Sequence, residues 1–139
     1  DLGNDALLDA VSVAEEQGAC GIIATNTTIQ RYGLPDVGPG GLSGIPLHAR
    51  SVEVVRHVAK HTTLPVIGVG GIRNGTDILR VLAAGAEAVQ LYSGLVFEGP
   101  RLISRMNRYL DDCLDKYGVS TIDDLKGALR QGDINIPAS

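Results

Sequence analysis

Glycines gather at the points where two short apolar runs of the sequence end. The segment VIGVGG (66–71) ends at Gly71, and the segment AVQLYSG (88–94) carries Tyr92 and Ser93. Glycine has no Cβ, so a ligand can approach its backbone closely, and backbone N–H groups can donate to an anion without adding positive charge. The spacing matches neither a Walker A loop nor a dinucleotide fingerprint. A glycine cluster alone also fits a tight strand-to-helix turn, but two such loops on consecutive strands predict a phosphate seat.

Polar side chains follow another apolar run nearer the N-terminus. In the segment ATNTT (24–28), four polar residues come directly after the apolar run: Thr25, Asn26, Thr27 and Thr28. An asparagine offers donors and an acceptor, as a small planar substrate with carbonyl, ring N–H and carboxylate groups requires. The loop GPGGLSGIP (38–46) is a further glycine-rich segment. A solvated turn and a mobile surface loop are the alternative interpretations of these two segments.

The spacing of apolar residues predicts the helices that position these loops. The first helix is capped by Asn4 and stopped by Gly18, and the second has Pro46 in its first turn. The third is capped by Thr76 and ended by Gly85. A short helical turn over 94–99 leads to a long helix opened by Pro100, and a last helix starts near Ser120 or Thr121. The tail after Gly132 is expected to be irregular.

Three strands are predicted between these helices, in CGIIAT (20–25), LPVIGV (64–69) and AVQLYS (88–93). They are apolar on both faces, which is typical of a parallel sheet covered by helices, so the chain is expected to be an α/β protein. An open doubly wound sheet and a (β/α)8 TIM barrel are the competing architectures. A barrel needs eight strands and about 250 residues. On the barrel hypothesis this chain of 139 residues therefore supplies only about three β/α units.

Composition and charge exclude several classes of function. The formal net charge of −4 argues against a surface that neutralises nucleic-acid phosphates, so no nucleic-acid partner is expected. The apolar runs have the length of strands rather than the roughly 20 residues that span a bilayer. The N-terminal segment lacks the features of a secretion signal. A chain that is 44% hydrophobic and 20% charged fits one ordinary soluble domain or a piece of a larger one.

The cysteines and histidines carry no predicted chemistry. Cys20 and Cys113 are interpreted as reduced core thiols, because no residues near them have the spacing of metal ligands. His48, His57 and His61 lie on or beside the second predicted helix and are interpreted as solvated surface. No metal site is expected.

Four segments in this order and spacing carry a resemblance to a known family: ATNTT, GGLSGIPL, VIGVGGI and VQLYSG. They resemble the C-terminal half of the class 2, quinone-dependent dihydroorotate dehydrogenases, which are FMN enzymes of pyrimidine synthesis built on a (β/α)8 TIM barrel. The resemblance runs from about residue 1 to residue 117. It implies that residues 1–117 are the C-terminal half of an FMN-binding barrel, with strands six to eight, and that 118–139 form a C-terminal helix and tail.

The resemblance also implies roles for individual residues. Asn26 and Thr27 would hold dihydroorotate or orotate, and five residues would contact FMN: Thr25, Gly44, Gly71, Tyr92 and Ser93. Gly71, Tyr92 and Ser93 would hold the FMN phosphate. No catalytic residue is assigned, because the serine base of class 2 and a lysine near the flavin would lie N-terminal to this chain.

The expected parent enzyme oxidises (S)-dihydroorotate to orotate and passes electrons from FMN to a quinone, whereas the chain alone is expected to be nearly inactive. N-terminal helices outside the chain would rest on the bacterial cytoplasmic membrane, or on the mitochondrial inner membrane in a eukaryote. The alternatives are a class 1 dihydroorotate dehydrogenase, another FMN or phosphate-binding barrel, and a non-catalytic phosphate-binding half-barrel.

Overall fold

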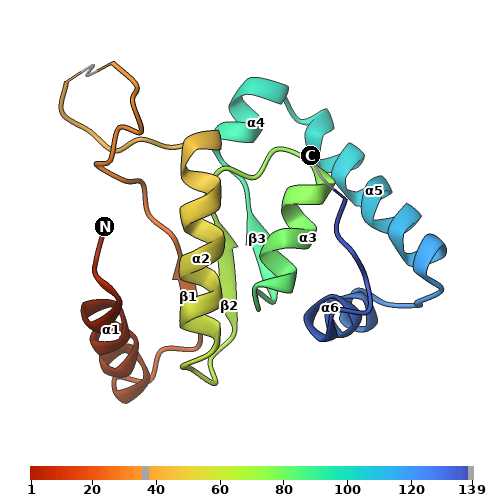
Figure 1. Ribbon diagram of the computed structural model, residues 1–139, viewed down its shortest axis with the longest axis horizontal. Helices are drawn as coiled ribbons and strands as arrows, with labels where there is room; N and C mark the ends of the chain where they lie inside the picture. Colours follow the sequence, from red (N-terminus) through yellow and green to blue (C-terminus); the bar gives the residue numbers. More distant parts are fainter. Residues whose placement is uncertain (36–37, 138–139) are drawn as a thin grey trace.

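The computed structural model describes residues 1–35 and 38–137, and its helices and strands alternate along the chain before a helical C-terminal part (Figure 1). The first part contains α1 (Asn4–Glu16), β1 (Ile22–Ala24), α2 (His48–Ala59), β2 (Val66–Val69), α3 (Gly75–Ala83) and β3 (Ala88–Gln90). A 3-10 turn, η1 (Ile45–Leu47), leads into α2. The C-terminal part contains α4 (Ser93–Glu98), α5 (Arg101–Tyr117) and α6 (Ile122–Gln131).

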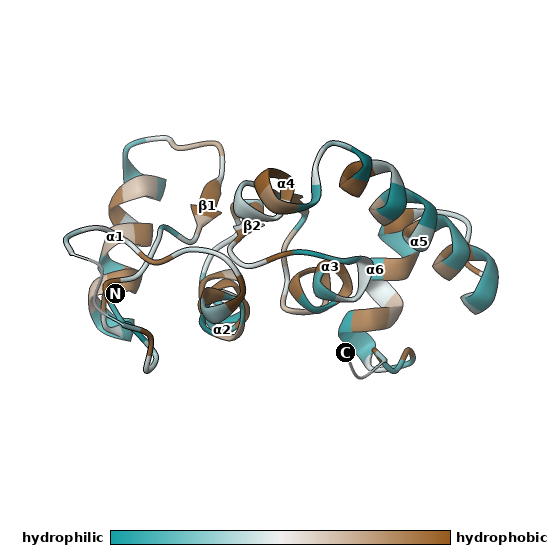
Figure 2. Cartoon of the chain, turned by 90° about the horizontal axis from the view of Figure 1, so that it is seen from above, coloured by the Kyte–Doolittle hydropathy of each residue, from teal (hydrophilic) through white to brown (hydrophobic). Residues whose placement is uncertain are grey.

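The sheet has three parallel strands in the order β1-β2-β3, which confirms the expected α/β class. Figure 2 shows α2 and α3 along one face of this sheet. Gly68 of β2 lies on that face, where an added Cβ would stand 2.2 Å from Cγ1 of Val81. Only glycine therefore lets the helix layer pack this closely on the central strand. The opposite face is open to solvent, and the Ile23 side chain on it is 59% exposed.

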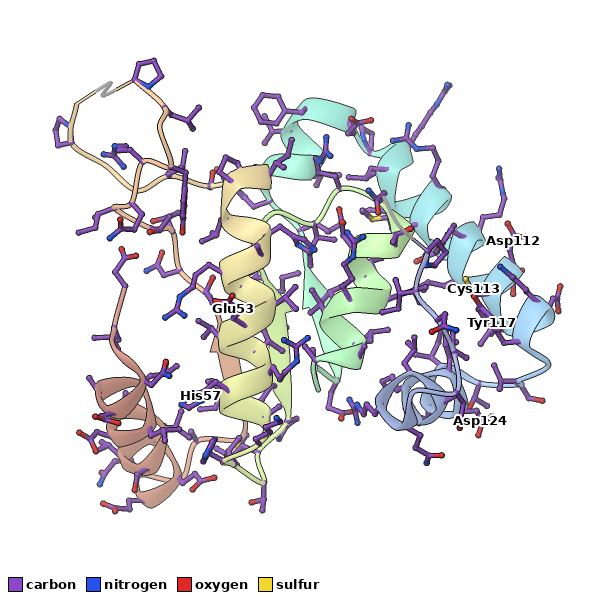
Figure 3. All side chains as sticks on the ribbon, viewed as in Figure 1. Glu53, His57, Asp112, Cys113, Tyr117 and Asp124 are labelled. Carbon is purple, nitrogen blue, oxygen red and sulfur yellow. The ribbon has the colours of Figure 1, made fainter. Side chains whose placement is uncertain are left out.

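The core lies between the sheet and this helix layer and continues between α3 and the C-terminal helices α5 and α6. Its largest fully buried side chains come from α2, β2, α3, α5 and α6, and include Leu79, Leu102, Leu125, Val55 and Val58. The two α5 residues Met106 and Cys113 are buried as their helical spacing predicts. Figure 3 shows Cys113 of α5 on the side of α6. Burial raises the pKa of the Cys113 thiol, which suits an inert core residue.

Two predicted helix caps are wrong. The residue before α1 is Gly3, and Asn4 is already helical. In α3 the cap is Asn74, whose Oδ1 accepts from the backbone N–H of Asp77 at 2.8 Å. Thr76 lies inside the first turn, and its hydroxyl instead contacts the Tyr109 hydroxyl at 3.1 Å. Several residues in these turns have cap-forming side chains, so sequence spacing alone did not select the right one.

Other predicted boundaries are confirmed. Gly18 follows the end of α1 with φ 78°, and Gly85 follows α3 with φ 115°. Pro100 immediately precedes α5. Thr121 caps α6 in a reciprocal capping box with Asp124. The strands are shorter than predicted, however, because β3 ends at Gln90 and the predicted strand residue Ser93 instead begins α4.

The helix α6 is tied to the opposite end of the sheet from α4. Nζ of Lys126 lies 2.5 Å from a carboxylate oxygen of Glu87 and 2.7 Å from one of Asp123. Arg130 donates to the Ala86 carbonyl at 2.9 Å and to Glu87 at 3.0 Å. The hydrogen bond from Lys126 lowers the pKa of Glu87 despite partial burial, and the bonds to Asp123 and Glu87 raise the pKa of Lys126. We call this group of four charged residues the α6 clamp.

Two further predictions about side-chain environment are wrong. Cys20 is exposed rather than buried, because it stands before β1 in the turn that follows α1. His48 is not solvated surface, since only 13% of its side chain is accessible. His57 is half-buried on α2 (Figure 3), and His61 is exposed as expected. Within residues 1–35 and 38–137, no helix combines the length and apolarity that a bilayer span requires.

Candidate functional site

The loops that leave the carboxyl ends of β1, β2 and β3 enclose one cavity of about 120 Å³, to which the segment before η1 also contributes. All seven residues predicted to bind substrate or cofactor line this cavity: Thr25, Asn26, Thr27, Gly44, Gly71, Tyr92 and Ser93. They come together because parallel strands end at the same edge of a sheet, which carries their following loops to one place. In Figure 1 this edge is the end of the sheet near α4.

Glycines let these loops pack on one another. Gly71 has φ 66°, and an added Cβ would lie 2.7 Å from the Gly44 carbonyl oxygen and 2.7 Å from Cβ of His48. At Gly94, an added Cβ would lie 2.5 Å from the Ile72 carbonyl oxygen. The space beside Gly71 is therefore filled by neighbouring protein atoms. Its lack of a side chain serves the approach of two loops, which differs from the approach to an anion that the sequence suggested.

The polar groups around the cavity are uncharged. The hydroxyl oxygens of Ser43 and Ser93 lie 2.8 Å apart and join the loop before η1 to the first residue of α4. No Lys, Arg, His, Asp or Glu is found among the cavity-lining residues in the described part of the chain. Hydroxyl groups and main-chain N–H groups of glycine-rich turns suit the oxygens of a phosphate without a compensating cation. The lining thus fits a phosphate group.

The segment after β1 presents its amide to the cavity. Oδ1 of Asn26 accepts from the backbone N–H of Thr27 at 2.7 Å, and both residues are exposed. The Asn26 side-chain NH₂ group has no acceptor among the described residues, so it is available to donate. Thr25 is half-buried, and its N–H donates to the Val69 carbonyl at 2.8 Å across to β2. The peptide bond between Ala24 and Thr25 is cis.

The sequence did not predict the partners of Thr28, and it did not identify His48 and Ser51 as residues near the cavity. Thr28 is 2% exposed, pairs with Leu42 through two backbone hydrogen bonds, and donates its hydroxyl to the Asp1 carboxylate. Behind Gly70, His48 and Ser51 both donate to the Gly70 carbonyl, at 3.2 Å and 2.9 Å. Their partners are backbone carbonyls and a residue far away in sequence, which carry no signal in residue type or spacing.

The described residues contain no cluster that could bind a metal ion. Among residues 1–35 and 38–137, no three His, Cys, Asp or Glu side chains gather in a way that could hold a metal ion. His57 of α2 and His61, just after its C-terminal end, have ring centroids 4.7 Å apart, and neither lines the cavity. Glu53, which also lies on α2 (Figure 3), pairs with Arg50 at 3.4 Å.

The fold and the site define a parallel α/β protein whose strand ends converge on an uncharged, phosphate-sized cavity. The sequence matches the profile of the family described as dihydroorotate dehydrogenase over residues 1–114. The chain therefore belongs to the dihydroorotate dehydrogenase family, and the recognition made from the four sequence segments is confirmed.

Relatives and solved structures agree with this assignment. The chain is 45% identical over 132 residues to the dihydroorotate dehydrogenase (quinone) of Halobacterium salinarum, covering 92% of this chain and 38% of that protein. It is 51% identical over 116 residues to the protein of the same name from Chloroflexus aurantiacus, covering 78% of this chain and 32% of that protein. It resembles the crystal structure of DHODH from Eimeria tenella in complex with ferulenol, with a TM-score of 0.81 and 36% identity, over 91% of this chain and 35% of that one.

Proposed function

We propose that this chain forms the C-terminal part of an FMN-dependent enzyme that oxidises (S)-dihydroorotate to orotate in pyrimidine synthesis, with a quinone as electron acceptor. The observation that carries the proposal is the convergence of all seven predicted binding residues on one cavity. Relatives named dihydroorotate dehydrogenase (quinone) support the reaction and the acceptor. The chain covers 38% and 32% of those two relatives, so the remainder of such an enzyme would lie outside it.

The three β/α units belong, in this proposal, to a (β/α)8 barrel in which β1, β2 and β3 are strands six to eight. The open sheet face that carries Ile23 would then point into the barrel interior. A second cavity of about 360 Å³ lies beside the edge strand β1 and is lined largely by apolar residues, among them Leu7, Ile22 and Val54. A further strand added to this edge would fill it. Residues 1–117 would form the barrel part, and 118–139 a C-terminal helix and tail.

The FMN phosphate would sit between the loops after β2 and β3. Gly71, Tyr92 and Ser93 would hold it through main-chain N–H groups and the Ser93 hydroxyl, with Gly44 and Thr25 against the flavin. FMN, when bound, supplies the acceptor for the hydride that leaves the substrate. The residues of this chain bind and orient. Their uncharged donors would keep the phosphate in place without adding positive charge near the reacting ring.

Asn26 and Thr27 would hold dihydroorotate. The Asn26 side-chain NH₂ group is available to a substrate carbonyl or carboxylate, because its Oδ1 is already engaged by the N–H of Thr27 at 2.7 Å. No residue of this chain is proposed as the base that takes the substrate proton. That serine, a flavin-side lysine, the quinone path and a peripheral contact with the cytoplasmic or mitochondrial inner membrane would all belong to the N-terminal part of the enzyme.

Flavin spectroscopy with and without the N-terminal part tests the proposal. The purified chain is mixed with a separately produced N-terminal half from the same protein, and FMN absorbance is followed while dihydroorotate is added without oxygen. A yellow complex that bleaches with dihydroorotate only when both halves are present is the expected result. A yellow complex that dihydroorotate leaves unchanged would indicate a different FMN barrel. Phosphate binding by the chain alone, with no flavin uptake in either case, would favour the non-catalytic half-barrel.

A further inference from the structure

Behind the proposed phosphate seat, two side chains hold one backbone carbonyl. The Gly70 carbonyl oxygen accepts from Nδ1 of His48 at 3.2 Å and from the Ser51 hydroxyl at 2.9 Å. A carbonyl oxygen only accepts, so Nδ1 of His48 carries the proton in this contact. Both donors come from the first turn of α2, and neither lines the cavity. The Gly70 carbonyl therefore points away from the cavity, toward α2.

The direction of this carbonyl fixes the direction of the next N–H group. The Gly70–Gly71 peptide is trans, which places its carbonyl and its N–H on opposite sides of the peptide plane. Because the carbonyl of Gly70 points toward α2, the N–H of Gly71 points the other way. Gly71 lines the cavity, and its N–H has no acceptor among the residues that the structure describes. A donor is thus held ready on the cavity side.

Without these side chains, the two glycines would leave the peptide free to rotate. Gly70 has φ 136° and Gly71 has φ 66°, and glycine adopts positive and negative φ with similar ease. A rotated peptide would turn the Gly70 carbonyl oxygen into the cavity, where it would repel a phosphate oxygen instead of donating to it. Because the two glycines allow both orientations of the peptide group, other residues must hold it in one of them.

The two donors are themselves held in place. Ser51 is 1% exposed, and its single hydroxyl proton is shared between the carbonyl oxygens of His48 and Gly70, each 2.9 Å away. Nε2 of His48 has no hydrogen-bond partner among the described residues and lies 3.5 Å from Oδ1 of Asp77, a residue that is 5% exposed. Asp77 in turn accepts from the backbone N–H of Arg73 at 3.0 Å and pairs with Arg80 at 3.3 Å. The loop after β2 is thus tied on its far side to both α2 and α3.

We propose that His48 and Ser51 are positioning residues that lock the Gly70–Gly71 peptide with its N–H toward the flavin phosphate, and so set the preference of the enzyme for FMN over unphosphorylated riboflavin. This inference rests on the proposed function, because it assumes that the phosphate lies in this cavity. Neither residue touches the flavin. They act through the orientation of one peptide group.

The test compares two flavins that differ by the phosphate alone. In the complete polypeptide that carries this segment, dissociation constants of FMN and riboflavin for the apoprotein are measured by flavin fluorescence for His48→Leu, His48→Asn and Ser51→Ala. His48→Leu and Ser51→Ala should each raise the dissociation constant of FMN by about tenfold, which is the loss expected when a hydrogen bond that orients a donor to a charged group is removed. Riboflavin affinity should stay within about twofold. The Asn side chain of His48→Asn can still donate to the Gly70 carbonyl and should restore most FMN affinity.

A Ser93→Ala variant separates this inference from the proposed function. The Ser93 hydroxyl of the wild type lies at the cavity. If Ser93→Ala loses the preference for FMN over riboflavin while His48→Leu and Ser51→Ala keep it, the proposed role of His48 and Ser51 is refuted. The proposed phosphate site would then still stand. Equal weakening of FMN and riboflavin in His48→Leu and Ser51→Ala would also refute it, since general loosening of the loop has no preference for phosphate. A wild-type protein that binds both flavins equally would overturn the phosphate seat and the lock together.

Discussion

The two ends of the sheet are held together by different kinds of interaction. At the carboxyl end, the loops meet through glycine packing, hydroxyl pairs and backbone carbonyls, and no charged side chain lines the cavity there in the described part of the chain. At the amino end, the α6 clamp joins Lys126, Glu87, Asp123 and Arg130 through charged contacts. Uncharged donors leave a site ready for an anion, whereas the paired charges at the other end satisfy one another.

This division separates binding from anchoring. A carboxylate at the carboxyl end would repel a phosphate, and a free lysine there would draw other anions. At the amino end, the same groups fasten a C-terminal helix to the turn before β3 without affecting the cavity. We therefore expect changes at the carboxyl end to alter flavin and substrate binding, and changes in the α6 clamp to alter stability alone.

The largest expected effect comes from Gly71→Ala, compared with Gly118→Ala. Both glycines have φ 66°, but an added Cβ at Gly118 meets nothing within 4 Å, whereas at Gly71 it meets the Gly44 carbonyl oxygen at 2.7 Å. Gly118→Ala should lower the free energy of unfolding by about 1 kcal/mol through backbone strain. Gly71→Ala should lower it by at least about 3 kcal/mol and displace the flavin. Urea unfolding and flavin content of the complete protein measure both. Equal losses would mean that loop packing at Gly71 contributes nothing.

The next effect is expected from Asn26→Ala. Removing the side-chain amide would leave polar groups of a bound substrate without partners, which costs about 2 kcal/mol and lowers kcat/KM for dihydroorotate by about thirtyfold. Flavin content should stay unchanged, because Asn26 is assigned to substrate. Steady-state kinetics measures the loss of turnover, and the ratio of flavin to protein absorbance measures any loss of flavin. Loss of flavin with normal kinetics in the remaining holoenzyme would reverse the assignment.

The sequence predicted the meeting of the binding residues because a parallel topology dictates it. Once three apolar strands separated by helices are recognised, the segments after β1, β2 and β3 must lie at one edge. The glycine-rich loop 38–46 was noted from its residues, but the role of Gly44 itself came from the family resemblance, since a long irregular loop has no periodicity that would place one residue. The predicted burial of Cys20 was wrong for a related reason. A residue beside an apolar run need not be part of the strand.

The environment of His48 could not be predicted because its partners are backbone groups. A histidine at the start of a helix reads as solvated surface by residue type, and the Gly70 carbonyl that it contacts comes from 22 residues further along the chain. The same holds for Asn74, the cap of α3, because Thr76 and Asp77 directly after it also have side chains that can cap a helix. Sequence patterns thus recover which segments converge, while the hydrogen bonds that set their orientation depend on distances that only the folded chain defines.

A smaller effect is expected from Lys126→Met in the α6 clamp. Lys126 is 7% exposed, and its loss would leave Glu87 with Arg130 as its remaining partner at 3.0 Å. The free energy of unfolding should fall by about 1–2 kcal/mol. FMN and riboflavin affinities should not change. Lys60→Met, at the exposed end of α2, is the matched control and should be neutral in urea unfolding. A change in flavin affinity in Lys126→Met would break the separation between the two ends.

The smallest effect is a pH dependence that belongs to Glu87. Its pKa is lowered in the folded protein, chiefly by the hydrogen bond from Lys126, below an ordinary value of 4.5. The folded carboxylate therefore contributes stability above about pH 4.5 that is lost as the pH falls through its folded pKa. Since 42% of the Glu87 side chain is accessible, Glu87→Gln should cost less than about 1 kcal/mol at neutral pH. Below pH 4.5 the difference in melting temperature between wild type and Glu87→Gln should shrink toward zero. A difference that persists unchanged into acid would show that packing, rather than charge, fastens α6 at this end of the sheet.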